Sequence, residues 1–285
     1  MGEIIELTEE NLEQYDSLIG AEETENIGRE YYRGIVITDD EENVIASGIW
    51  EMIHIDDDEK DTEARLVSMR AKDDKTAEQL LEECQERLRE EDVVDCFFEL
   101  HPCDNCISKK AFEKAGFDVS ETESSDIVVT LKELSEKAFS GSGKTPPYIR
   151  ELGNLMVRSF RRGVMDCIFY SRRELMEDLG TISMSWFEQQ VSSYVETDGR
   201  VSGYLLIHKT PSSRLRIEVL TASGGDSKKD LLSMMVFSLR QALENYPEDT
   251  EVVVCRRDAD VKNLTDYLLP EVKGVKVLSG RKEDI

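Results

Sequence analysis

The sequence predicts an α/β (α+β) protein with two tandem domains, each a mixed, mostly antiparallel sheet flanked by helices. The main observation is that one order of predicted elements occurs twice along the chain. The second is the stretch Ser140-Gly-Ser-Gly-Lys-Thr-Pro-Pro147, whose composition is typical of an exposed connection between domains. The 285 residues, 39% of them hydrophobic, are enough for two cores. We therefore expect domains at residues 1–134 and 150–285.

Both halves contain antiparallel hairpins that lead into a strand-helix-strand-helix unit. The assignments rest on β-branched and aromatic runs for the strands and on apolar residues at helical spacing for the helices. In the first half the predicted strands are 32–38, 44–52, 64–69 and 93–100, and the predicted helices are 76–88 and 104–115. In the second half they are strands near 192–196 and at 201–208, 215–220 and 251–255, and helices at 228–245 and 260–269. Asp104 is the expected N-cap of helix 104–115.

The net charge of −26 is confined to the first half. Residues 1–134 contain 39 Asp and Glu against 13 Lys and Arg, whereas residues 135–285 contain 22 of each. This balance argues against nucleic acid as a partner, because phosphates would be repelled. An anionic ligand such as coenzyme A should meet less repulsion in the second half. The alternative is that the acidic half is only a well-solvated surface.

The chain has no apolar run near the roughly 20 residues that a membrane span needs, and it begins without the basic segment of a signal peptide. We expect a cytoplasmic protein with no membrane partner. Its six cysteines are too sparse for a disulfide scaffold and should stay reduced. The pair Cys103 and Cys106 beside His101 could suggest zinc. A tetrahedral site needs four ligands, however, and there is no second cysteine pair, so we expect no metal.

Two motifs in the first half resemble the GNAT N-acyltransferases. Residues 105–117, Asn-x-x-Ser-x-x-Ala-Phe-Glu-Lys-Ala-Gly-Phe, are similar to the family's "N-x-x-A-x-x-hydrophobic-Tyr-Glu-Lys-hydrophobic-Gly-Phe" ending. Residues 67–81, Val-x-Met-x-x-Lys-x-x-Lys-x-Ala-x-x-Leu-Leu, fall without gaps on its coenzyme A loop. In the second half, residues 198–207 resemble the family's central hairpin. The chain therefore looks like two tandem GNAT-like domains.

The resemblance implies that acetyl-CoA, or another acyl-CoA, is the co-substrate. Its pantetheine arm would bond to backbone groups freed where two parallel strands splay, and its pyrophosphate would lie on the following helix N-terminus. In the first copy the matching cofactor positions are Lys72, Lys75, Ala77 and Asn105. Lys75 stands where a glycine is usual, Asp73 and Asp74 add negative charge, and Phe112 replaces the tyrosine that protonates the leaving thiolate. We expect the first copy to be non-catalytic.

The second copy offers a different set of candidates. Gly224 and Gly225 can adopt unusual backbone angles, and Ser227, Lys228 and Lys229 can contact phosphate. Tyr267 falls on the family's acid position, and Glu218 lies where many members place a base. The alternatives are that Tyr267 is a partly buried core tyrosine and that Glu218 is an ordinary outward-facing glutamate.

These residues favour an acyl-CoA-dependent N-acyltransferase (N-acetyltransferase) that acts on an amine of a small molecule or peptide. The alternative is that both copies have decayed into an inactive acyl-CoA-binding or scaffold protein. The expected partners are acyl-CoA and an amine substrate, and a homodimer is left open.

Overall fold

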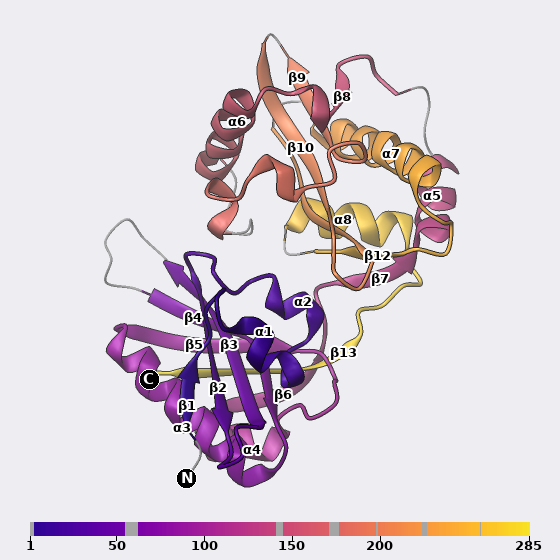
Figure 1. Cartoon of the computed structure of the whole chain (residues 1–285). Coiled ribbons are helices and arrows are strands. Elements are labelled where there is room, and N and C mark those ends of the chain that lie inside the picture. Colours follow the sequence, from indigo (N-terminus) through magenta and orange to yellow (C-terminus); the bar gives the residue numbers. More distant parts are fainter. Residues whose placement is uncertain are drawn as a thin grey trace. The chain divides into compact units, whose positions relative to one another are not determined.

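The computed structural model describes residues 3–54, 62–140, 145–170, 177–197, 199–223, 227–256 and 258–285. The chain forms two compact units (Figure 1). The first contains residues 1–124 and 275–285, and the second contains residues 125–274. Each unit is a mixed, mostly antiparallel sheet flanked by helices, which confirms the predicted fold class.

The sheet of the first unit has the strand order β1-β2-β3-β4-β5-β13-β6, in which β4 and β5 run parallel. The strands are β1 (Ile4–Glu6), β2 (Tyr32–Thr38), β3 (Val44–His54), β4 (Thr62–Ala71), β5 (Val93–Leu100), β6 (Asp118–Glu123) and β13 (Lys276–Glu283). The helices are α1 (Leu12–Tyr15), α2 (Ala21–Thr24), α3 (Asp74–Glu90) and α4 (Lys109–Lys114), with a 3-10 turn at Asp16–Leu18.

The sheet of the second unit has the order β7-β12-β11-β10-β9-β8, in which β11 and β12 run parallel. The strands are β7 (Ile127–Thr130), β8 (Ile149–Glu151), β9 (Ser193–Thr197), β10 (Arg200–Lys209), β11 (Leu215–Ala222) and β12 (Glu251–Val254). The helices are α5 (Leu131–Ser140), α6 (Val157–Tyr170), α7 (Ser227–Asn245) and α8 (Ala259–Leu268), with 3-10 turns at Leu152–Asn154, Glu177–Gly180 and Met184–Trp186.

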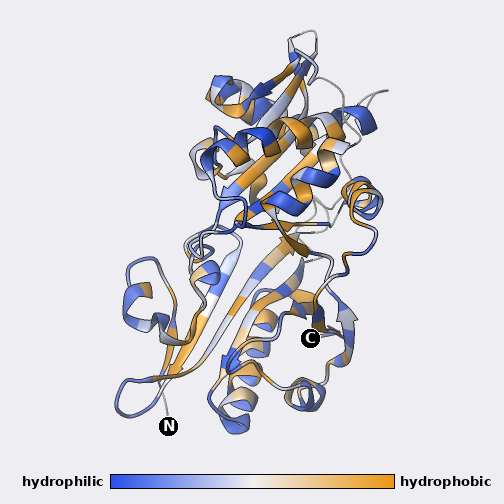
Figure 2. Ribbon diagram, turned by 90° about the vertical axis from the view of Figure 1, so that its right-hand side faces the viewer, coloured by the Kyte–Doolittle hydropathy of each residue, from blue (hydrophilic) through white to orange (hydrophobic). Residues whose placement is uncertain are grey.

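Both faces of each sheet are covered. In β2, Ile35 and Ile37 pack into the core beneath α3 and α4, whereas Tyr32 and Val36 pack into the core on the opposite face. A strand buried on both faces is apolar throughout, which is why residues 32–38 do not alternate with polar ones. Figure 2 shows apolar residues concentrated along the strands.

Helix α4 is shorter than the sequence predicts. It begins at Lys109, and Ser108 is its N-cap, accepting a hydrogen bond from the Ala111 N–H. Asn105 has a left-handed backbone with φ of 60°, which no α-helix can contain, so the helix cannot start at residue 104. The prediction of Asp104 as the N-cap is therefore wrong.

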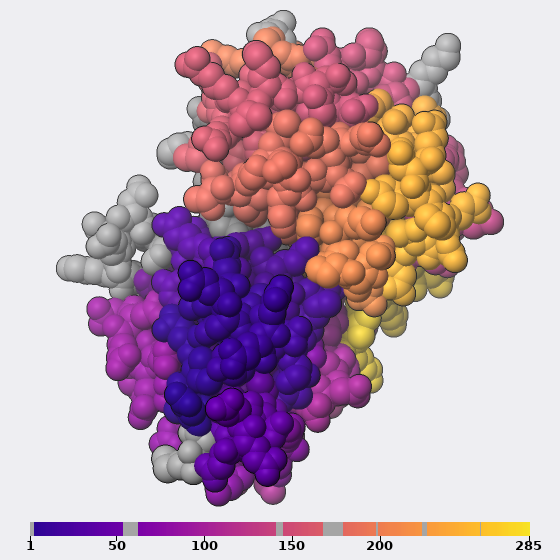
Figure 3. Space-filling view, viewed as in Figure 1, coloured from indigo at the N-terminus to yellow at the C-terminus, as the bar shows by residue number. Residues whose placement is uncertain are grey.

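The first sheet contains a strand from the far end of the chain, and the second sheet begins earlier in the chain than the predicted boundary. Strand β13 lies between β5 and β6 and pairs antiparallel with both, so the C-terminal segment lies in the first unit, where Figure 3 shows its yellow residues beside magenta ones. Strand β7 follows directly on the first unit and pairs with β12. The predicted ranges, 1–134 and 150–285, put β7 in the first domain and β13 in the second, whereas the units put β7 in the second and β13 in the first. Hydrophobic periodicity marks a strand but does not say which sheet it joins.

Cleavage of the connection between Ser140 and Thr145 should leave the protein in one piece under native conditions. After the cut, β7 and α5 of the N-terminal fragment still complete the second sheet, and β13 of the C-terminal fragment still completes the first. We expect an inserted protease site there to give two bands on a denaturing gel and one peak in size-exclusion chromatography. Two separate native peaks would contradict the pairing of β7 with β12 and of β13 with β5 and β6.

Candidate functional site

In each sheet a β-bulge lies where the parallel strand pair ends. Pairing of β4 with β5 ends at Leu66 and Phe98, and Val67 is the extra residue of β4 opposite β3. Pairing of β11 with β12 ends at Ile217 and Val254, and Glu218 is the extra residue of β11 opposite β10. A bulge bends its strand and disrupts the ladder locally. In both units, therefore, the parallel neighbour stops pairing with the bulged strand at the bulge.

In the first unit, the chain itself occupies this edge. The Ala71 N–H donates to the Asn105 carbonyl oxygen at 2.8 Å, and the Ile107 N–H donates to the Met69 carbonyl oxygen at 3.2 Å. Between them, Arg70 and Cys106 form an antiparallel bridge. Residues 105–107 thus take the backbone groups of β4 that the resemblance assigns to a pantetheine arm. Asn105 is part of this cover through its backbone, and its predicted role in cofactor binding stays a prediction.

The N-terminus of α3 is also occupied from within the chain. The Asp73 carboxylate accepts a hydrogen bond from the Thr76 N–H at 2.8 Å, and the Thr76 hydroxyl accepts one from the Asp73 N–H at 3.3 Å. The hydrogen bonds that the Thr76 N–H and hydroxyl donate to the carboxylate lower the pKa of Asp73, because they stabilise its charged form. Lys72 and Lys75 are exposed beside this cap, and Ala77 is buried inside the helix. A carboxylate therefore lies where the pyrophosphate was expected.

Phe112, at the acid position of the family, is a core residue. Its side chain is fully buried, and its ring stacks on Phe98 with the centroids 4.1 Å apart. Phe117 meets it edge to face at 5.6 Å. This position supplies packing and no proton donor.

In the second unit, the corresponding edge is not covered in the same way. Counted from the bulged residues, Leu220 and Ala222 of β11 correspond to Met69 and Ala71 of β4. Within the described part of the chain, no backbone hydrogen bond engages β11 beyond Ile217 on the side of β12, and the last one runs from the Cys255 N–H to the Ile217 carbonyl oxygen at 3.3 Å. The backbone arrangement therefore allows another extended group to pair there.

The loop after this edge is longer than its counterpart in the first unit. Helix α3 begins seven positions after the bulged residue of β4, and α7 begins nine positions after that of β11. Gly224 and Gly225 lie in this loop, outside the described residues. Helix α7 starts at Ser227, and Lys228 and Lys229 are exposed in its first turn. The two lysines are therefore available to an anion at the helix N-terminus.

Glu218 belongs to a buried charged cluster. Its carboxylate pairs with the Arg216 guanidinium at 2.9 Å, and a second nitrogen of Arg216 pairs with Asp126 at 2.9 Å. The carboxylate side chains are only 11% and 12% exposed, and the Cys255 sulfur lies 3.7 Å from an oxygen of each. Glu218 is therefore not an ordinary outward-facing glutamate.

The groups around Arg216 decide whether its guanidinium stays charged. Burial by itself disfavours the charged guanidinium, but Cys255, Glu218 and Asp126 together outweigh that penalty and raise the pKa of Arg216. Arg216 thus remains a cation that fixes both carboxylates. One signal for this cluster is visible in the sequence, because Arg216 and Glu218 lie two positions apart on one predicted strand. Nothing in the sequence places Asp126 or Cys255 beside them, because those residues come from other segments.

Tyr267 lies on the exposed side of α8. Its side chain is 77% exposed, whereas Val261, Thr265 and Leu268 of the same helix are buried. The alternative that Tyr267 is a partly buried core tyrosine is therefore wrong. Its role as a proton donor stays a prediction.

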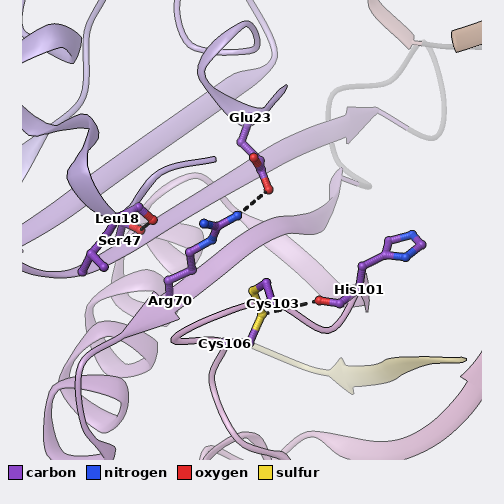
Figure 4. The surroundings of a disulfide bond; sticks show 7 residues. All are labelled: Leu18, Glu23, Ser47, Arg70, His101, Cys103 and Cys106. Carbon is purple, nitrogen blue, oxygen red and sulfur yellow. Dashed lines mark hydrogen bonds and ion pairs between the residues drawn. A yellow bond between two sulfur atoms is a disulfide. The ribbon is translucent and has the colours of Figure 1, made fainter. Parts of the chain in front are cut away.

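Cys103 and Cys106 form a disulfide, so the expectation that every cysteine stays reduced is wrong for this pair (Figure 4). The remaining cysteines are free thiols. Among the residues that the structure describes, no three His, Cys, Asp or Glu side chains are grouped to hold a metal ion. In the same residues, no helix combines the length and the apolar character needed to cross a membrane.

No family model and no curated protein matches this sequence. Solved structures do. A tandem GNAT protein from the clavulanic acid biosynthesis pathway is similar with a TM-score of 0.62 at 12% identity, over 100% of this chain and 99% of that one. A probable N-acyltransferase from Enterococcus faecalis is similar with a TM-score of 0.53 at 8% identity, over 100% of this chain and 72% of that one.

A third similar structure is the GCN5-related glucosamine N-acetyltransferase region of a fungal multi-domain β-N-acetylglucosaminidase, with a TM-score of 0.59 at 10% identity. It is matched over 99% of this chain, which spans only 38% of the fungal protein. Together these likenesses show that the chain has a tandem GNAT fold, as the sequence motifs implied.

Replacing Phe112 by tyrosine should destabilise the first unit and should not restore an active site. The added hydroxyl would enter a fully buried aromatic cluster and lose its hydration, at a cost of about 1–3 kcal/mol. Denaturant unfolding measures this cost. Phe97→Tyr is the matched control, because Phe97 is only partly buried and its hydroxyl can reach water. Equal stability of the two variants would contradict the assignment of Phe112 to the core.

Proposed function

We propose that the protein is an acyl-CoA-dependent N-acyltransferase whose co-substrate binds in the second unit. The observation that carries this proposal is the contrast between the two bulged strands. Residues 105–107 cover the edge of β4, whereas the described residues leave the edge of β11 without a backbone partner beyond Ile217. An extended pantetheine arm, which carries amide groups, can form the missing hydrogen bonds with β11.

Electrostatics support the same unit. The first turn of α7 presents Lys228 and Lys229, whereas the first turn of α3 begins at a carboxylate cap, Asp73. An anion is stabilised at a helix N-terminus by the N–H groups and the helix dipole, and lysines add to this attraction. Residues 125–274 also carry a net charge of only −2, from 22 Asp and Glu against 20 Lys and Arg. The pyrophosphate of acyl-CoA is therefore better accommodated at α7.

The proposed reaction transfers an acyl group from sulfur to nitrogen. The neutral amine attacks the thioester carbon, backbone N–H groups of β11 stabilise the oxyanion, and the coenzyme A thiolate leaves. Glu218, directly or through water, accepts the proton that the amine loses, and Tyr267 supplies one to the thiolate. Arg216 and Asp126 are positioning residues, because they fix the orientation of the Glu218 carboxylate. The acceptor is an amine of a small molecule or peptide.

An inactive acyl-CoA-binding protein is the second candidate. It is favoured by the ion pair that already engages Glu218 and by the exposure of Tyr267. Calorimetry with acetyl-CoA, followed by an assay for coenzyme A release with a panel of polyamines, aminoglycosides and lysine peptides, separates the two. Binding without release by any amine would favour the inactive binder.

Reversing the charge of the α7 lysines should weaken acetyl-CoA binding. We expect Lys228→Glu with Lys229→Glu to raise the Kd by tenfold or more, about 1.4 kcal/mol, because the pyrophosphate then meets two carboxylates. Isothermal titration calorimetry measures the change. The matched control is Lys72→Glu with Lys75→Glu, which makes the same charge reversal in the first unit and should leave the Kd unchanged. The opposite pattern would move the site to the first unit.

The two proposed proton-transfer residues should act on turnover rather than on affinity. Glu218→Gln and Tyr267→Phe should each lower kcat for the best acceptor, by roughly 100-fold or more if that group is the only route for its proton. Acetyl-CoA affinity should change little in Tyr267→Phe. Steady-state kinetics over a pH range, beside calorimetry of each variant, tests this. Wild-type turnover in Tyr267→Phe would remove that residue from the mechanism.

A further inference from the structure

One loop of the first unit holds a disulfide (Figure 4), and the backbone of the same loop pairs with the edge of β4. Cys103 and Cys106 are bonded to each other three positions apart. Asn105 lies inside the ring that this bond closes, and its carbonyl oxygen accepts a hydrogen bond from the Ala71 N–H of β4. Ile107 follows the ring, and its N–H donates to the Met69 carbonyl oxygen of β4. The ring and the cover over β4 are therefore built from the same few residues.

This pair contains the most exposed cysteine of the protein. Cys103 is exposed, Cys106 and Cys167 are partly exposed, and Cys84, Cys96 and Cys255 are buried. Burial raises the pKa of the Cys84 thiol to about 12 and that of Cys167 to about 11, and it raises the pKa of Cys96 as well. Protonated thiols are poor nucleophiles, so these three exchange slowly at neutral pH. We therefore expect thiol–disulfide exchange at Cys103 and Cys106.

We propose that Cys103 and Cys106 form a reversible dithiol/disulfide site, reduced by a dithiol compound or protein, whose disulfide form clamps residues 105–107 onto β4. The inference does not depend on where acyl-CoA binds.

A dithiol by itself supplies the electrons and protons that reduce this disulfide. One thiolate of the reductant attacks the exposed Cys103 sulfur, the bond between Cys103 and Cys106 breaks, and Cys106 leaves as a thiolate that takes up a proton. The second thiol of the reductant then attacks the mixed disulfide and releases Cys103. The protein gains two electrons and two protons, and the reductant becomes a disulfide. In the reduced form the Cys106 thiol can donate to the His101 carbonyl oxygen, which lies 3.4 Å away.

Opening the ring should loosen the cover. The disulfide restricts a short, largely exposed segment that also holds Asn105 in the left-handed conformation at φ of 60°. Without it, the segment is held on β4 by two backbone hydrogen bonds and by the buried side chain of Ile107, a small set of local contacts that can open without unfolding of the whole unit. The Ala71 N–H and the Met69 carbonyl then become available to water or to another extended chain.

Hydrogen exchange of the full-length protein tests the proposal. Air-oxidised protein should gain two reactive thiols on native treatment with dithiothreitol, and the amides of Ala71 and Ile107 should then exchange faster, on the order of tenfold. The amides of α3 should not respond. Cys103→Ser should show fast exchange in both conditions, because it cannot close the ring. Cys167→Ser, which leaves the pair intact, should respond to dithiothreitol as the wild type does.

Several outcomes would overturn the proposal. Peptide mapping of the air-oxidised protein that finds Cys103 and Cys106 unlinked would remove the site. A bond that dithiothreitol reduces only in denaturant would make it a structural disulfide. Unchanged exchange of Ala71 and Ile107 after reduction would show that the backbone contacts hold without the clamp. None of these measurements uses acyl-CoA or an amine, so a failure here leaves the proposed function to its own tests.

Discussion

The extra residue that ends each parallel strand pair is the constraint on which the rest of the site depends. At Val67 in β4 and Glu218 in β11, two residues face one partner, and hydrogen bonding to the parallel neighbour stops. Backbone groups freed inside a protein must find partners, because an unpaired buried N–H or C=O costs free energy. The two units differ in which groups, if any, pair with these freed backbone N–H and C=O groups.

The first unit fills it with its own chain. Residues 105–107 pair with β4, the Asp73 carboxylate caps α3, and Phe112 completes an aromatic cluster. Each is a stabilising local solution, and each takes a place that a cofactor or a proton donor would need. The second unit instead places a charged cluster at the bulge, where Arg216 holds Glu218 and Asp126. Buried carboxylates persist only when paired, and removing one partner of such a pair typically costs about 3–5 kcal/mol, so this cluster is held firmly.

The pairing of two strands at the unit boundaries adds a second constraint. Strand β13 returns to the first sheet between β5 and β6, and β7 completes the second beside β12. Asp126, at the entry to β7, reaches the charged cluster because β7 pairs with β12. The composition of the site in the second unit thus depends on a segment that follows the first unit directly in sequence.

The sequence by itself determined the order of the central elements of each unit and the fold. The bounds predicted for β2 and β5 are those observed, because apolar β-branched runs of this length leave few alternatives, and the repeated element order with the motifs at 67–81, 105–117 and 198–207 identified the tandem architecture. The start of α4, the sheets that β7 and β13 join, the disulfide and the cluster around Glu218 were decided only by the tertiary structure. Local patterns report which residues are buried and how often they recur. They do not report which distant backbone or side chain satisfies a freed hydrogen bond or a buried charge, since that partner is selected by the packing of the whole chain.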